Sequence, residues 1–315
     1  MKDIVITPYS KNLKNEWNTF LEYSKNSPFF FNRSFIEYHK LRFCDYSALV
    51  YAGDRLVAVI PATIDKAKNA VNSHGGLTFG GFVVHQEMTT MLFLECFSSY
   101  LDFLKENKIQ KLLYKAIPYF YHQYPSAEEY YAAFKFGGKL VRRDVGSILN
   151  LRSKIMFSSL RKRMIKKACS LEVEVKEVDS LSDYWNLLTE VLVSRHDVLP
   201  VHSLDEIEKL QYLFPQNIRL FGAYLGKRML AGVLIFESKV VAHAQYIASS
   251  DAGRSCGALD LIFERLINNF YRHKNYFSFG ISTEQNGAYL NEGLIAQKEG
   301  FGARATVLDH YEFDL

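Results

Sequence analysis

Hydrophobic and polar positions alternate between helical and extended patterns along the first half of the chain. Apolar side chains at Leu13, Trp17 and Phe20 keep the three-to-four-residue spacing of a helix. Two extended apolar runs meet at Gly53 and Asp54, which predicts a hairpin. The remaining pattern predicts a glycine-rich strand and loop, then a helix and two further strands, over 72–84, 87–107, 108–117 and 137–151.

The second half repeats this order. A basic helix is predicted over 153–170, a strand over 171–178 and a helix over 180–196. Three antiparallel strands are predicted within 218–249, since turn residues interrupt an apolar run there. The last predicted elements are a helix, a strand, a helix and a strand, over 257–275, 276–282, 288–300 and 306–315. Two halves of similar order predict an α/β (α+β) protein of two duplicated domains, 1–150 and 151–315, each a mixed, mainly antiparallel sheet flanked by helices.

Composition agrees with a large folded protein. The 315 residues are 48% hydrophobic and 15% aromatic, which excludes a disordered chain. A net charge of +4 is too small to indicate DNA binding but suits an anionic ligand. The cysteines stand far apart, so neither a metal site nor a disulfide framework is predicted. Without a signal-peptide pattern or an apolar run of membrane-spanning length, we expect a cytoplasmic protein with no transmembrane segment.

A polar loop follows the strand predicted at 276–282. Ser282, Thr283, Glu284 and Asn286 lie together there, followed by Gly287. Loops at strand ends commonly carry the chemistry of α/β proteins. A surface turn built on Asn286 and Gly287 explains the same residues equally well.

Several stretches then resemble a known family. IRLFGAYLGKRMLAGVLIFESKVVAHAQYIAS, YFSFGIS, QKEGFGAR and YEFDL resemble FemAB/FemX proteins in order and spacing. Those are non-ribosomal peptidyltransferases that extend peptidoglycan cross-bridges, and their fold is two tandem domains of the GNAT (Gcn5-related N-acetyltransferase) type. The resemblance covers 151–315. SHGGLTFGG in the first half looks like a motif of FemAB-like acyltransferases associated with bacterial surface polysaccharides.

The resemblance implies an acyl-transfer site in the second domain. Lys298 matches the family lysine at the reacting centre, where an ammonium can stabilise an oxyanion. Glu284 is the candidate general base. Tyr246, Ser282 and Asn286 are candidate contacts to the acceptor. Each also has an ordinary structural explanation, as a helix-end lysine, an exposed loop acid, a core tyrosine or turn residues.

Donor binding is expected at the start of the helix predicted over 257–275, the central helix of the second domain. Arg254, Gly257 and Ala258 fit most of the GNAT pattern for the pyrophosphate of acetyl-CoA, with Leu259 at its last place. The alternative is a helix capped by Ser255 after a turn at Ala252 and Gly253. Other candidate substrate contacts are Arg195 and His202, in a loop between helices, and His74 in the glycine-rich segment.

Two departures from the family bear on the substrates. No long heptad-patterned arm is present, and Gln297 precedes the lysine where peptidyltransferases usually carry an aromatic residue. We therefore expect an N-acyltransferase using acyl-CoA on an amine of a small-molecule or sugar-nucleotide precursor of a cell-surface polysaccharide. The alternatives are aminoacyl-tRNA-dependent transfer to a peptidoglycan precursor and a non-catalytic ligand-binding protein.

The predicted basic helix at 153–170 leaves two further partners open. Its lysines and arginines could contact tRNA or an anionic membrane surface. A solvated helix face accounts for the same charges.

Overall fold

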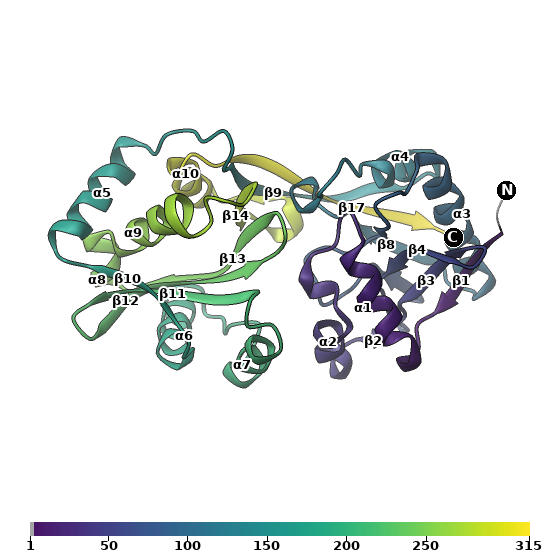
Figure 1. Cartoon of the computed structure of the whole chain (residues 1–315), viewed down its shortest axis with the longest axis horizontal. Coiled ribbons are helices and arrows are strands. Elements are labelled where there is room, and N and C mark those ends of the chain that lie inside the picture. The colour runs from purple at the N-terminus through teal and green to yellow at the C-terminus, as the bar shows by residue number, and fades with distance from the viewer. Residues whose placement is uncertain (1–2) are drawn as a thin grey trace. The chain divides into compact units, whose positions relative to one another are not determined.

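The computed structural model describes residues 3–315, apart from the side chains of His39 and His196 (Figure 1). The chain divides into two compact units. Unit 1 comprises the described part of Met1–Asp144 with Gln285–Gly287 and Val307–Leu315, and unit 2 comprises Val145–Glu284 with Ala288–Thr306. The strands β9 (Lys139–Asn150) and β17 (Arg304–Asp314) each contribute residues to both units. No helix within the described residues is long and apolar enough to cross a bilayer.

Unit 1 has two groups of strands. One sheet has the antiparallel order β1 (Ile4–Pro8), β3 (Ala48–Ala52), β4 (Arg55–Ile60) and β7 (Val83–Val84). The other group has the order β17, β8 (Lys111–Lys115), β6 (Ala70–Asn72), β5 (Thr63–Asp65) and β2 (Cys44–Asp45). Its helices are α1 (Lys14–Glu22), α2 (Arg33–Ile36), α3 (Thr90–Glu106) and α4 (Glu128–Lys135).

The long helix α3 fixes the core of unit 1. It follows β7 and precedes β8, on the connection from β6 to β8, and these two strands run parallel. Phe93, Phe97 and Tyr100 on its inner side pack with Phe82 and Tyr114 from the strand side. Apolar side chains three to four residues apart thus cover the sheet, as the sequence pattern predicted.

Unit 2 contains one mixed sheet. Its order is β10 (Glu174–Val178), β11 (Ile218–Leu225), β12 (Arg228–Glu237), β13 (Val241–Ser249), β14 (Tyr276–Ile281) and β9. Figure 1 shows α5 (Ser159–Ser170) and α9 (Ala258–Arg265) on one face, and α6 (Ser182–His196) and α7 (Leu204–Leu213) on the other. The remaining elements are α8 (Asp251–Cys256), α10 (Glu292–Gly300) and the hairpin of β15 (Thr283–Glu284) and β16 (Tyr289–Leu290).

The sheet of unit 2 is antiparallel except at one position. β13 and β14 run parallel and are connected through α8 and α9. They pair only from Val241 with Tyr276 to His243 with Ser278, although β13 continues to Ser249 and β14 to Ile281. Backbone groups beyond the last pair are therefore released from the ladder at the carboxyl ends of two parallel strands, where open α/β sheets bind ligands.

Three local expectations were wrong. The helix expected from residue 288 begins at Glu292, because Tyr289 and Leu290 pair with β15 and Asn291 caps the helix. The alternative turn at Ala252 and Gly253 is helical, and Ser250 rather than Ser255 caps it. Arg195, assigned above to a loop between helices, lies in the last turn of α6, within the helix predicted over 180–196.

Candidate functional site

A cavity of about 260 Å³ opens in unit 2 where β13 and β14 part. Its apolar wall combines residues of α6, β13, α9, β14 and α10 with Phe301: Val191, Ile247, Ala248, Leu259, Phe263, Phe279, Leu294 and Phe301. Its polar groups are Arg195, Ser249, Arg254, Gln297 and Lys298. An apolar pocket with a few convergent polar groups is the usual form of a small-molecule site.

Lys298 is the buried cation of this cavity, with only 4% of its surface exposed. The Asn291 cap starts α10, and Lys298 follows in the last turn of that helix. Its ammonium donates to the carbonyl oxygens of Gly280 at 3.2 Å and Ile281 at 2.6 Å, both at the end of β14. An ammonium has three N–H donors, so these two bonds leave one for a ligand. Burial lowers the pKa of Lys298 to about 8.

His243 and Ser278 form a polar pair across the last parallel rung. The imidazole Nδ1 lies 2.9 Å from the Ser278 hydroxyl. Desolvation and then the nearby Lys298 charge lower the pKa of His243 to about 4, so the ring is neutral at neutral pH. From the sequence, strand alternation placed His243 on the face opposite Tyr246 and made it the weaker candidate, and Ser278 was not selected. Their pairing follows from the parallel register, which only the fold defines.

Two arginines supply positive charge at the cavity. Arg254 donates to the carbonyl oxygen of Ser249 at 2.7 Å and is ion-paired with Asp251. Arg195 reaches the same carboxylate at 2.9 Å. Asp251 is 90% exposed, so solvent screens its negative charge, and Lys298 adds a third cation at the cavity. The net charge of these groups is positive, which suits an anionic ligand.

Of the three residues predicted to bind the pyrophosphate, Arg254 lines the cavity, whereas Gly257 and Ala258 do not. Gly257 is the single residue between α8 and α9, and Ala258 is fully buried in the core. Neither lines the cavity. The Gly257 amide bonds back to Arg254 in α8 at 3.4 Å. The segment before α9 is thus itself the short helix α8, and it contributes the Arg254 side chain to the cavity.

Gly257 is required by packing and by backbone conformation together. Its φ is +81°, and a Cβ there would collide with the carbonyl of Met164 in α5. We expect Gly257→Ala to lower the free energy of unfolding by about 2–4 kcal/mol, combining left-handed strain with that clash. Chemical denaturation measures this loss.

Gly226→Ala is the matched control for this substitution. Gly226 also has a positive φ, of +58°, but no atom lies within 4 Å of its ideal Cβ. This variant should lose only the conformational part, about 1–2 kcal/mol. Equal losses at the two positions would contradict the packing of Gly257 against α5.

Tyr246 and His202 meet beside α6. The Tyr246 hydroxyl lies 2.6 Å from His202 Nδ1, and Trp185 packs edge-on against the Tyr246 ring. Burial raises the pKa of Tyr246 to about 12. Neither residue lines the cavity.

The expected face of His243 was wrong. Simple alternation places it opposite Tyr246, but the β12–β13 register shifts between Leu234 and Ile235. Leu234 then pairs with Tyr246, and Phe236 pairs with His243, so both side chains share one face. The sequence of an apolar strand gives no clear signal for a one-residue bulge, so this change of face could not be predicted.

The polar loop after β14 contains residues in different surroundings. The Ser282 hydroxyl is buried and makes no hydrogen bond within the described part of the chain. Glu284 is exposed and accepts a bond from the Asn291 side chain at 2.9 Å. Asn286 belongs to unit 1, with a φ of +56°, and accepts a bond from Arg142 at 3.0 Å. Asn286 therefore forms a turn with Gly287, which was one of the two explanations given for it from the sequence.

His74 lies in unit 1, within the glycine-rich loop between β6 and β7. The side chain is 1% exposed, and its Nδ1 accepts a bond from the Gly76 amide at 3.2 Å. The loop is tied to β8, since Gly80 donates to the Lys115 carbonyl and the Lys115 ammonium donates to the Leu77 carbonyl. His74 is therefore held by its own loop inside unit 1.

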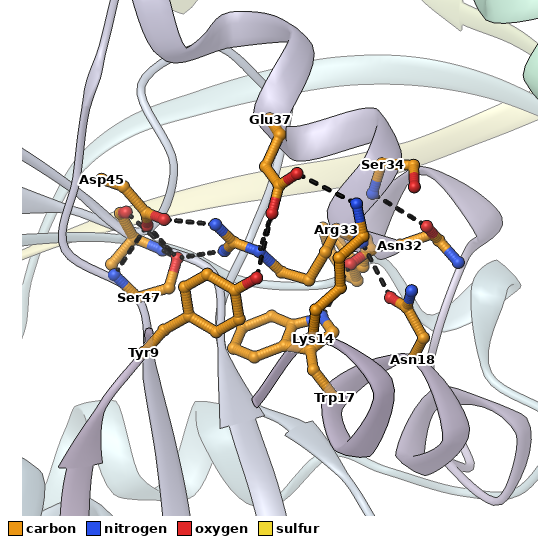
Figure 2. Close-up of polar contacts among 12 residues, drawn as sticks. Tyr9, Lys14, Trp17, Asn18, Asn32, Arg33, Ser34, Glu37, Asp45 and Ser47 are labelled. Carbon is orange, nitrogen blue, oxygen red and sulfur yellow. Dashed lines mark hydrogen bonds and ion pairs between the residues drawn. The ribbon is translucent and has the colours of Figure 1, made fainter. Parts of the chain in front are cut away.

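A second cavity, of about 210 Å³, lies in unit 1 beside a buried arginine. It is lined by Pro8, Tyr9, Asp45, Tyr46, Ser47, Phe103 and Asn107. Figure 2 shows the adjoining network, in which the Arg33 guanidinium points between Asp45, Ser47 and Glu37 and lies over the Tyr9 ring. The polar side chains of this network are bonded to one another, which indicates a structural role.

No protein-family model and no curated protein matches the sequence. Solved structures match over nearly the whole chain. The crystal structure of FemX has a TM-score of 0.70 at 11% identity, covering 99% of this chain and 97% of FemX. A lysylphosphatidylglycerol synthetase C-terminal domain from Agrobacterium fabrum, described as putative in its name, has a TM-score of 0.63 at 12% identity, covering 96% and 92%.

A third structure decides the type of fold. A tandem GNAT protein from the clavulanic acid biosynthesis pathway has a TM-score of 0.52 at 10% identity, covering 99% of this chain and 98% of that one. The chain has the tandem GNAT fold. The fold expected from the sequence is thereby confirmed. At such identity the likeness defines the fold alone, so the chemistry of the second GNAT unit is argued from its own residues.

Proposed function

We propose that this tandem GNAT protein is an N-acyltransferase whose site is the cavity of unit 2. The observation that carries the proposal is the position of Lys298, a buried ammonium fixed by two β14 carbonyls at the opening between β13 and β14. Such a cation is preorganised for negative charge, because it is already oriented and partly desolvated.

The proposed reaction forms an amide. The lone pair of an uncharged amine attacks an acyl carbonyl, and the carbonyl oxygen becomes an oxyanion opposite the third N–H of Lys298. Collapse of this intermediate expels the donor's leaving group, and the proton lost by the amine passes to Glu284, directly or through water, or to the leaving group. Ser282 is a candidate contact to the acceptor, since its buried hydroxyl lacks a partner within the described residues.

The proposed donor is an acyl-CoA. Arg195 and Arg254 offer guanidinium donors for its phosphates, and the apolar wall suits an acyl chain. The proposed acceptor is an amine on a small sugar-nucleotide or related precursor of a cell-surface polysaccharide, as the resemblance implies.

Aminoacyl-tRNA-dependent transfer is the second candidate. It is compatible with the surroundings of Gly257 and Ala258, which are packed against the core rather than exposed as a pyrophosphate cradle. A donor that needs no such cradle fits this arrangement as well as acyl-CoA does.

Thermal-shift titration tests the proposal. Acetyl-CoA, longer acyl-CoAs, free CoA and UDP-amino sugars are added separately, since a ligand that binds only the native state raises the melting temperature. A rise with CoA species that is lost in Arg254→Ala supports the proposed donor. Absence of any rise with CoA species, together with binding of charged tRNA, would replace it with the second candidate. Binding without turnover under all donors would make the chain a ligand-binding protein.

Turnover should fall on the alkaline side of pH 8. The proposed oxyanion partner is the ammonium form of Lys298, whose pKa burial lowers to about 8. As pH rises through that value the cation is lost, so the rate should decline about tenfold per pH unit. Lys298→Arg should remove this decline from the accessible range, because a guanidinium stays protonated. The same alkaline limb in both proteins would exclude Lys298 as its origin.

Tyr246→Phe should affect the acceptor more than the donor. The change removes the hydroxyl that lies 2.6 Å from His202 and leaves the ring against Trp185. If this pair contacts the acceptor, the acceptor KM should rise about tenfold with the donor KM unchanged, as for one hydrogen bond of about 1–1.5 kcal/mol. An unchanged acceptor KM would assign the pair to the core.

A further inference from the structure

Helix α5 and the segment before it carry positive charge without acidic residues. Between 151 and 170 there are seven lysines and arginines and no aspartate or glutamate: Arg152, Lys154, Arg161, Lys162, Arg163, Lys166 and Lys167. This density is unusual in a chain whose net charge is only +4. The proposed acyl-transfer chemistry uses none of these residues.

Some of these cations are already bound within unit 2. Arg161 is ion-paired with Asp260 at 2.8 Å, and Lys167 donates to the Ser255 carbonyl at 2.8 Å. Lys162, Arg163 and Lys166 are exposed and have no ion pair within residues 3–315. Their charges are therefore available to an anionic partner.

Large apolar side chains are exposed at the start of α5 and in the segment just before it. Met156 is 74% exposed, and Ile155 and Leu160 are each 44% exposed. The other side of α5 packs against unit 2, since Ala168 is buried and Ile165 contacts the hydrophobic core around α9. In Figure 1 no other element of unit 2 covers the outer side of α5.

We infer that this surface, Ile155, Met156 and Leu160 with Lys162, Arg163 and Lys166, docks unit 2 onto an anionic lipid membrane. Peripheral helices combine these two features, because cations meet lipid headgroups and apolar side chains enter the acyl boundary. A nucleic acid backbone accounts for the charges alone. Binding of a nucleic acid backbone does not explain why the apolar side chains of Met156 and Ile155 are exposed.

The docking surface adjoins the cavity of unit 2. The Ser158 amide at the start of α5 donates to the Gly300 carbonyl at 2.8 Å, at the end of α10. The Arg161 guanidinium lies 5.4 Å from the centre of the Phe301 ring, and Phe301 lines the cavity. A membrane bound at α5 would hold the cavity close to the lipid headgroups. The inference does not depend on the proposed reaction.

Vesicle cosedimentation tests the inference with the full chain. The vesicles contain phosphatidylcholine alone or with about one-third phosphatidylglycerol as the anionic lipid. Binding is expected only to the anionic vesicles, and Lys162→Gln, Arg163→Gln and Lys166→Gln combined should weaken it about 100-fold. Ile155→Ser with Met156→Ser should weaken it about tenfold at an unchanged charge. Lys209→Gln with Tyr212→Ser on α7 is the matched control, since both residues are exposed there.

A tryptophan reporter locates the contact. The native Trp17 and Trp185 are 0% and 5% exposed, so they supply a constant background. Met156→Trp should show a blue-shifted emission on adding anionic vesicles, whereas Tyr212→Trp should not. The inference is overturned if the chain ignores anionic vesicles, if both surface variants bind like the control, or if only RNA binds and Ile155→Ser with Met156→Ser does not weaken it.

Discussion

Replacing Lys298 with alanine is expected to lower kcat about 100- to 1,000-fold, the loss typical of removing one oxyanion donor. The ammonium has no substitute at its position, because Arg195 and Arg254 are held at Asp251 and Ser249. The KM values should change little, since the third N–H meets negative charge only as it develops. Steady-state kinetics with the donor identified by thermal shift measures both quantities.

The fold of the Lys298→Ala variant should be retained. Burying an ammonium is costly, as the lowered pKa of Lys298 indicates, so its loss removes a cost along with two hydrogen bonds. The melting temperature should therefore stay within a few degrees of the parent. Lys209→Ala on α7 is the control, because it removes an exposed lysine from the same unit. Full activity of Lys298→Ala would remove this residue from the mechanism.

Most elements of the fold could be predicted because their signals are local. The Gly53–Asp54 turn joins β3 and β4 as expected, and Ser203 with Glu206 forms a capping box at α7. α8 could not be predicted with the same methods. Its six residues have no apolar period, and it is defined by the Ser250 cap and the left-handed Gly257 that ends it.

The candidate site depended on information of two kinds. Lys298 was selected from a resemblance, since a lysine in the last turn of a helix has no local signal for burial. The cavity itself arises where the pairing of β13 and β14 ends, and that is a property of the sheet. Phe263 and Phe279 lie in apolar stretches that predict core positions. They do belong to the core, and they also form part of the cavity wall.

Arg33→Ala in unit 1 is expected to be the most destabilising substitution considered, at about 3–5 kcal/mol of unfolding free energy, because it removes a large, fully buried side chain. The Arg33 side chain is 1% exposed, and its guanidinium carbon lies 3.6 Å from the centre of the Tyr9 ring. It is ion-paired with Asp45 and donates to the Ser47 hydroxyl at 3.1 Å. Alanine would leave a cavity against the Tyr9 ring, and it would also leave the partly exposed Asp45 without its charge partner, a smaller loss. Equilibrium denaturation with urea measures the loss.

Arg55→Ala is the matched control in the same unit. Arg55 is ion-paired with Glu87 at 2.5 Å, but the two side chains are 50% and 63% exposed, so its removal should cost at most about 1 kcal/mol. Similar losses for the two arginines would contradict the structural role of the Arg33 network.

The pH dependence of Arg33→Ala supplies an independent check. Desolvation raises the pKa of Asp45, but the Arg33 charge and hydrogen bonds outweigh it and hold this pKa below the ordinary 3.8. A lowered carboxyl pKa stabilises the fold above its ordinary value, and the stabilisation disappears as pH falls below that value. The difference between parent and variant should therefore be complete at neutral pH and shrink below about pH 4. A difference that stays constant over this range would assign the loss to the cavity against the Tyr9 ring rather than to the ion pair.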